Sequence, residues 1–177
     1  MRRAAFLTTP AKISGEVQRF CQSLTTQPPQ MIKAVPFPGC DGDDPAVILP
    51  GHIERFGGCA VQGWRILSWP RVMLHAEPHW VWHSPKDELI DVCATADRAG
   101  QAVFLAAEPQ TIPTVQRLAL IRDANLLAWL DLAAQNRESE NQAMDLFLAV
   151  VKKHSRPGDP CWCGSGRQLR KCHPFQK

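Results

Sequence analysis

Four metal-ligand residues near the end of the sequence constrain this chain more than any other feature: Cys161, Cys163, Cys172 and His173. One residue separates the first two thiols, and eight residues separate that pair from an adjacent thiol and imidazole. Zn²⁺ binds four such ligands tetrahedrally, with sulfur at about 2.3 Å and nitrogen at about 2.0–2.1 Å. A segment this short cannot bury a core of its own. The spacing therefore predicts a closed, structural zinc site whose metal supplies most of the local folding free energy.

The residues around these ligands suit such a site. Gly164 and Gly166 allow sharp backbone turns between the two ligand pairs. The segment resembles the SEC-C motif, a zinc-binding tail known from the preprotein-translocase motor ATPase and found on many other bacterial proteins. Trp162 stands where that family usually has Pro, but this position is not a ligand. The resemblance covers roughly the last twenty residues, and its matching positions are Asp159, Pro160, Cys161, Cys163, Gly164, Ser165, Gly166, the basic run 167–171, Cys172 and His173.

Charge is unevenly distributed along the chain. From Val151 onward seven basic residues face one acid, a charge of +6, which leaves −3 for the rest of a chain whose net charge is +3. A basic tail favours acidic partners, such as ribosomal RNA or an acidic protein surface, although the same charge could serve only to keep the tail soluble. The tail lacks the helix-borne spacing of DNA-reading fingers, so DNA binding ranks last.

Length and cysteine usage bound the class of protein. A chain of 177 residues suits one domain with a small appendage, here an α+β body over 1–154 and a zinc-binding tail over 155–177. Seven cysteines include three zinc thiolates, which argue for a reducing compartment even though the remaining four, Cys21, Cys40, Cys59 and Cys93, could pair. No apolar run approaches the ~20 residues of a membrane span, and the first apolar run is too short for a signal peptide. We expect a soluble, cytoplasmic protein.

The hydrophobic pattern predicts a small antiparallel sheet with helices, two C-terminal helices and the zinc knuckle. A first helix should begin after Ser14, with Cys21 on its apolar side. Prolines and glycines should leave only one helical turn at 52–56 and a connector at 104–113. Strands are expected at 63–67, 72–74, 79–83 and 87–92, and the last two helices at 123–134 and from about 139.

The predicted strands 79–83 and 87–92 form a hairpin around the turn 84–86. This register pairs His83 with Asp87 and His79 with Asp91, so the last two would share a face. The opposite face would carry apolar side chains suited to a core, namely Trp80, Trp82, Ile90 and Val92.

This hairpin carries a second, less specific resemblance. A pattern common in uncharacterised bacterial proteins, many with the same zinc tail, is matched over roughly 40–92 by Gly57-Gly58, Gly63-Trp64, Ala76 to His79, Val81-Trp82 and Leu89 to Val92. The arrangement is similar to the transglutaminase-like and papain-like group. The resemblance implies Cys40 as nucleophile, His79 as its base and Asp91 as the carboxylate that orients the imidazole. Cys59 is the second candidate thiol.

Another interpretation of these residues stays open. His79 can be a strand histidine with Asp91 as its ion-pair partner, and Cys40 a loop thiol, while His75 and His83 can be ordinary surface residues. Three acids beside Cys40, at positions 41, 43 and 44, would also disfavour its thiolate. Two functions follow. The chain is a zinc-binding adaptor that docks on a protein or ribosomal partner, or a Cys-His-Asp hydrolase or transferase that the zinc tail targets.

Overall fold

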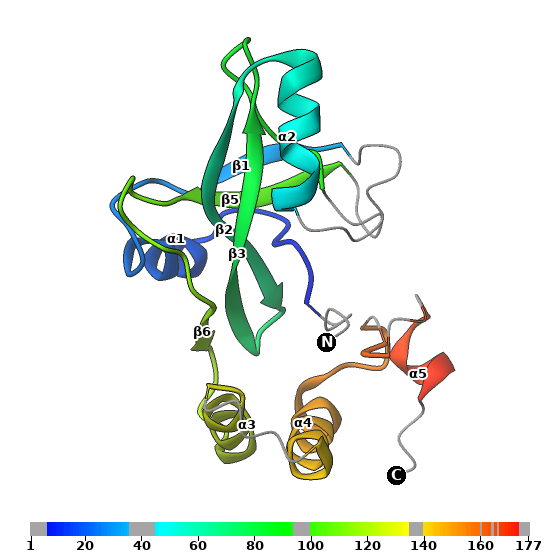
Figure 1. Ribbon diagram of the computed structural model, residues 1–177. Coiled ribbons are helices and arrows are strands. Elements are labelled where there is room, and N and C mark those ends of the chain that lie inside the picture. Colours follow the sequence, from blue (N-terminus) through cyan, green and yellow to red (C-terminus); the bar gives the residue numbers. More distant parts are fainter. Residues whose placement is uncertain are drawn as a thin grey trace. The chain divides into compact units, whose positions relative to one another are not determined.

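The computed structural model describes residues 7–35, 45–93, 100–134, 140–159, 161–163, 165 and 167–173. The chain forms two compact units, and its elements are labelled in Figure 1. The first unit comprises Met1–Thr8, Trp69–Met73 and Arg117–Lys177; the second comprises Thr9–Ser68 and Leu74–Gln116. The predicted boundary between residues 154 and 155 stays a prediction.

The strands belong to one six-stranded sheet in the order β2-β5-β1-β4-β3-β6, and β2 also pairs with β3. That additional pairing closes β2, β5, β1, β4 and β3 into a ring, so the predicted small sheet is a closed one. The expected combination of helices and strands is confirmed. β1 and β4 run parallel, whereas the other pairs with a described register are antiparallel. The strands are β1 (Gln30–Ala34), β2 (Cys59–Trp69), β3 (Met73–His83), β4 (Leu89–Asp91), β5 (Gln101–Ala106) and β6 (Gln116–Ala119).

Strand β5 corrects the predicted connector at 104–113. It lies between β1 and β2, and its residues 102–105 are all buried. A strand covered on both faces reads as a continuous apolar run, without the alternation that reveals a half-exposed strand. Gly63 of β2 permits this packing, because a Cβ there would lie 2.1 Å from the carbonyl oxygen of Leu105.

The hairpin register is wrong by two residues. The turn is longer than expected, so His83 pairs with Leu89 and Trp82 with Ile90. A shift of two residues keeps every side chain on its predicted face, whereas a shift of one would reverse them. The predicted apolar face is therefore confirmed: Trp80, Trp82, Ile90 and Val92 pack in one cluster with Leu49.

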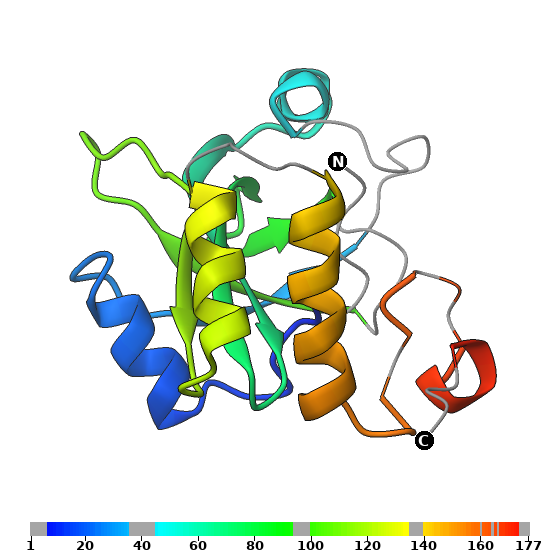
Figure 2. The ribbon, with the colours of Figure 1, turned by 90° about the horizontal axis from the view of Figure 1, so that it is seen from below.

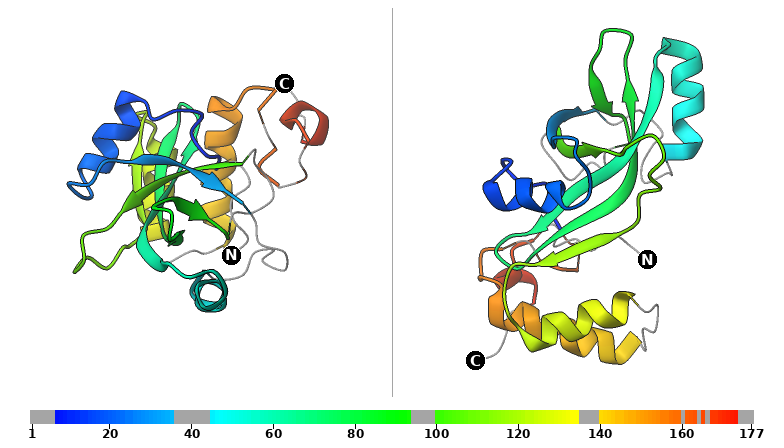
Figure 3. Two further views of the ribbon diagram at one scale, coloured as in Figure 1. Left: turned by 90° about the horizontal axis from the view of Figure 1, so that it is seen from above. Right: turned by 90° about the vertical axis from the view of Figure 1, so that its left-hand side faces the viewer.

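Helix α2 (Pro45–Phe56) provides Leu49 and lies alongside the strands in Figure 1 and in the right-hand view of Figure 3. The predicted single turn at 52–56 is wrong, since α2 contains 12 residues. Pro45 occupies the first helical position, where the missing N–H has no helical partner in any case. Pro50 costs the helix one hydrogen bond, which burial of Leu49 and His52 against the sheet offsets.

The other predicted helix of the second unit, α1 (Gly15–Gln22), is confirmed. Its N-cap is Ser14, whose Oγ accepts a hydrogen bond from the N–H of Val17 at 3.3 Å. Val17, Phe20 and Cys21 are buried along one side, at the spacing that the sequence predicts.

The first unit holds the two predicted C-terminal helices, α3 (Ala124–Ala134) and α4 (Glu140–His154), which lie side by side in Figure 2. Phe147 and Val151 of α4 share a core cluster with Trp69, at the end of β2, and with Cys161 and Leu169 of the tail. The tail ends in a short helix, α5 (Leu169–Cys172). Among the helices in the described ranges, none has the length and apolar character needed to cross a bilayer.

Candidate functional sites

The four predicted ligands converge in the first unit. The ligand atoms of Cys161, Cys163, Cys172 and His173 all lie within 4.8 Å of one another. The Sγ of Cys163 is 3.4 Å from both other sulfurs, and Nδ1 of His173 is 3.2 Å from Sγ of Cys161. A tetrahedral zinc with sulfur ligands separates neighbouring sulfurs by about 3.8 Å. The four residues are therefore positioned to bind a metal ion, and their donor set fits zinc.

Backbone hydrogen bonds hold the ligand segments together. The N–H of Cys161 donates to the carbonyl of Arg167 at 2.8 Å, and that of Leu169 donates to Asp159 at 2.9 Å. The carboxylate of Asp159 accepts from Arg71 at 3.0 Å and from the N–H of Arg156 at 2.7 Å. The ligands thus lie on a segment with its own hydrogen bonds.

The thiols of Cys161 and Cys163 differ in pKa. Hydrogen bonds from the hydroxyl and backbone of Ser165, and then from Cys161 and Cys172, lower the pKa of Cys163 to about 6. Burial raises the pKa of Cys161 to about 11. At neutral pH Cys163 already offers a thiolate, whereas Cys161 must lose its proton when a cation binds, as metal ligation requires.

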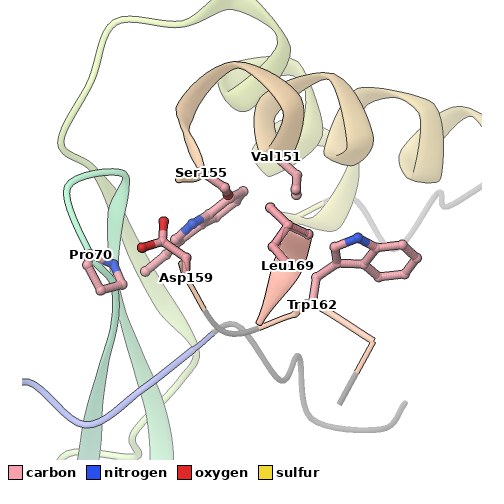
Figure 4. A pocket seen from close by; sticks show the side chains of 7 residues that line it. Pro70, Val151, Ser155, Asp159, Trp162 and Leu169 are labelled. Atoms are coloured by element: carbon pink, nitrogen blue, oxygen red, sulfur yellow. The ribbon is translucent and has the colours of Figure 1, made fainter. Parts of the chain in front are cut away.

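Trp162 joins the ligand cluster to the helices. Its ring centroid lies 4.9 Å from that of His173 and 5.8 Å from that of Phe147, the latter at 78°. Figure 4 shows its indole beside Val151 and Leu169 at a small pocket. The pocket volume is about 30 Å³, roughly the space of one or two waters. The pocket therefore suits tight packing of the tail better than binding of a substrate.

The second unit contains the predicted pair His79 and Asp91. Nε2 of His79 lies 3.0 Å from Oδ1 of Asp91, and both side chains are buried. In the observed register the two residues are diagonal neighbours on one face, and such neighbours remain within reach of each other. The predicted proximity is thus observed, while the catalytic roles of these residues stay a prediction.

Arg65 also belongs to this group, although its place there is not predicted from the sequence. Its Nη2 donates to Oδ2 of Asp91 at 3.0 Å, and the backbone N–H of Cys93 donates to Oδ1. Burial raises the pKa of Asp91, but the contacts with His79 and Arg65 outweigh it and leave the pKa below its usual range. The signal in the sequence is an arginine among the apolar residues of β2, but Asp91 lies 26 positions further along the chain.

The candidate thiols lie elsewhere. Cys40, the predicted nucleophile, is outside the described residues. Cys59 lies beside a different histidine, His83, and Cys93 is buried.

Comparison with known proteins adds one match. A protein-family model described as the SEC-C motif matches residues 159–173. No curated protein and no solved structure matches the chain. The match covers the segment that carries all four candidate ligands and none of the second unit.

Proposed function

We propose that this protein is a zinc-binding interaction protein whose tail docks onto an acidic partner. The observation that carries this proposal is the convergence of Cys161, Cys163, Cys172 and His173 within 4.8 Å, inside a segment that matches the SEC-C motif. All four positions of a tetrahedral zinc would be filled by protein, so the metal would stabilise the tail without taking part in a reaction.

Exposed positive charge supports a docking role. Arg167, Arg170 and Lys171 are exposed within the motif, and Lys152 and Arg156 are exposed just before it. The acid in this stretch, Asp159, is already paired with Arg71. A cationic surface of this kind attracts carboxylate-rich protein surfaces or the phosphates of ribosomal RNA.

Elemental analysis tests the metal. Full-length protein purified without chelator should contain close to one zinc per chain. Cys161→Ser should lower the zinc content strongly. Cys59→Ser, which removes a thiol outside the motif, should leave the zinc content unchanged. Protein without zinc, or equal zinc in the two variants, would refute the assignment.

Co-sedimentation with purified ribosomes tests the ribosomal partner. Binding should weaken as salt shortens the screening length from about 10 Å at 0.1 M to about 3 Å at 1 M. Arg167→Glu combined with Arg170→Glu should abolish binding, while Lys12→Glu, an exposed residue of the other unit, should not. If the charge reversal leaves binding intact, the tail is not the docking surface. If the zinc-loaded protein does not sediment at low salt, the partner is not the ribosome.

The contact between His79 and Asp91 favours a second candidate function, a thiol hydrolase or transferase that acts on an amide or thioester. Asp91 would orient the imidazole, and Cys40 would supply the nucleophile. Alkylation by iodoacetamide should then select Cys40 over Cys21, and His79→Ala should slow it. Equal alkylation of Cys40 in the wild type and in His79→Ala would refute this candidate.

A further inference from the structure

The second unit contains another group in which a thiol, an imidazole and a carboxylate lie next to one another in space. Sγ of Cys59 lies 3.9 Å from Nδ1 of His83, and Nε2 of the same ring lies 2.8 Å from Oδ1 of Asp87. The imidazole thus faces the thiol with one nitrogen and the carboxylate with the other. Cys59 is exposed and His83 is partly exposed, so a reagent in solution can reach the sulfur.

Close packing places Cys59 beside His83. Gly57 and Gly58 connect α2 to β2 with φ of 72° and 84°, values that favour glycine. A Cβ on Gly58 would lie 2.2 Å from the carbonyl oxygen of His83, so the turn touches the end of β3. Nε1 of Trp82 also donates to the carbonyl of Gly57 at 2.9 Å. These contacts hold the first residue of β2 against the last residue of β3.

The turn that follows β3 places the carboxylate. Oγ of Ser84 accepts hydrogen bonds from the N–H groups of Lys86 and Glu88, both at 3.2 Å. The N–H of Asp87 donates to the carbonyl of Ser84 at 3.0 Å. Asp87 has φ of 61°, a conformation that aspartate tolerates better than most residues. The turn is thereby fixed, and the carboxylate points back to His83.

We propose that Cys59 is a reactive thiol, activated by His83 and Asp87, that undergoes exchange with low-molecular-weight disulfides. The imidazole of His83 can accept the proton of the Cys59 thiol while Asp87 keeps the ring oriented. Thiol nucleophiles are activated by the same arrangement of a base and an orienting group. An exposed thiol next to an imidazole also has the surroundings typical of reactive cysteines. This site is separate from the candidate metal ligands and shares no residue with the His79–Asp91 group.

The reaction balances with a disulfide as the only co-reactant. The proton of the Cys59 thiol moves to Nδ1 of His83, and the thiolate attacks one sulfur of R–S–S–R. The bond between the two R-sulfurs breaks as the bond to Sγ forms, and the departing R–S⁻ takes the proton from the imidazolium. The products are a mixed disulfide at Cys59 and one R–SH, so the small disulfide is the oxidant. Asp87 acts as a positioning residue for the ring.

Full-length protein incubated with glutathione disulfide at neutral pH provides the test, with each cysteine followed by mass spectrometry of its peptide. Cys59 should react roughly tenfold faster than in a free peptide spanning 55–63, less than the 10²–10⁴-fold effect of a fully positioned base. His83→Ala should abolish the acceleration, and Asp87→Asn should reduce it. Asp131→Asn, which removes an exposed acid of α3, should leave the rate unchanged.

Circular dichroism shows whether each variant is folded. Asp87 is 95% exposed, so Asp87→Asn keeps the test decisive even if His83→Ala unfolds. Iodoacetamide should rank the variants in the same order, since the thiolate is the nucleophile toward both reagents. A rate at Cys59 equal to that of the free peptide, or a rate that neither folded variant changes, would overturn the proposal.

Discussion

Nη2 of Arg65 lies 3.0 Å from Oδ2 of Asp91, and the two side chains are 5% and 0% exposed. A buried ion pair such as this one gains little over an apolar pair, but removing one partner leaves an uncompensated charge in a low-dielectric surrounding. Asp91 also contacts His79, so the same carboxylate holds two basic side chains of different strands. Its loss should therefore affect stability whether or not the site is catalytic.

Asp91→Ala should lower the free energy of unfolding by about 3–5 kcal/mol, since Arg65 would remain buried and charged. Urea denaturation followed by tryptophan fluorescence measures the change. Asp87→Asn is the control, because that carboxylate is exposed on the neighbouring turn and asparagine tolerates its positive φ. A loss below about 0.5 kcal/mol, as expected of a surface substitution, would contradict the inferred role of the pair.

Asp123 should make the first unit sensitive to acid. Its Oδ2 accepts from His154 at 2.8 Å and Lys153 at 2.7 Å, and its Oδ1 caps α3. These bonds, that of His154 foremost, hold the pKa of Asp123 well below its usual range. A carboxylate with a lowered pKa stabilises the fold above its unfolded pKa of about 3.9, and this contribution is lost as the pH falls below that value.

Asp123→Asn can keep the cap but loses the charge that Lys153 and His154 contact, so it should cost about 1–2 kcal/mol at pH 7. The difference from wild type should shrink below about pH 4. Thermal unfolding at several pH values measures this. Asp131→Asn, an exposed acid of α3, serves as the control. A difference that stays constant down to pH 2 would show that the charge of Asp123 is not the cause.

Metal removal should loosen more than the ligand loop. Cys161 and Leu169 share a core cluster with Phe147 and Val150 of α4. A chelator should therefore increase hydrogen exchange in residues 157–173 and also in the last turns of α4, while β5 of the other unit stays protected. Exchange confined to residues after 157 would mean that α4 does not depend on the tail.

Trp162→Ala should weaken the link between the ligands and α4. The indole contacts the rings of both Phe147 and His173 and is only partly exposed, so a loss of about 1–2 kcal/mol is expected, less than for a fully buried tryptophan. Denaturation of the zinc-loaded protein measures it. Trp162→Pro, the residue usual in the SEC-C family, should give a similar loss; an unchanged midpoint in both variants would refute this role.

Spacing along the chain is enough to predict the features that depend on neighbouring residues. Two ligand pairs within thirteen residues had to meet if one cation was to hold them, and Cys161, Cys163, Cys172 and His173 do converge. Helices α1, α3 and α4 follow from a 3.6-residue apolar period. The faces of the β3–β4 hairpin follow from alternation, which even a register error of two residues preserves.

Contacts between residues that are distant in sequence depend on the tertiary packing. The closure of the sheet, the central place of β5 and the pairing of Arg65 with Asp91 all depend on strands that are far apart in sequence. Cys59 likewise reaches His83 across 24 residues. Spacing along the chain carries no information about such contacts, because the register of non-neighbouring strands is selected by the packing of the whole core. The same packing, which buries Leu49, stabilises α2 as a helix despite Pro50.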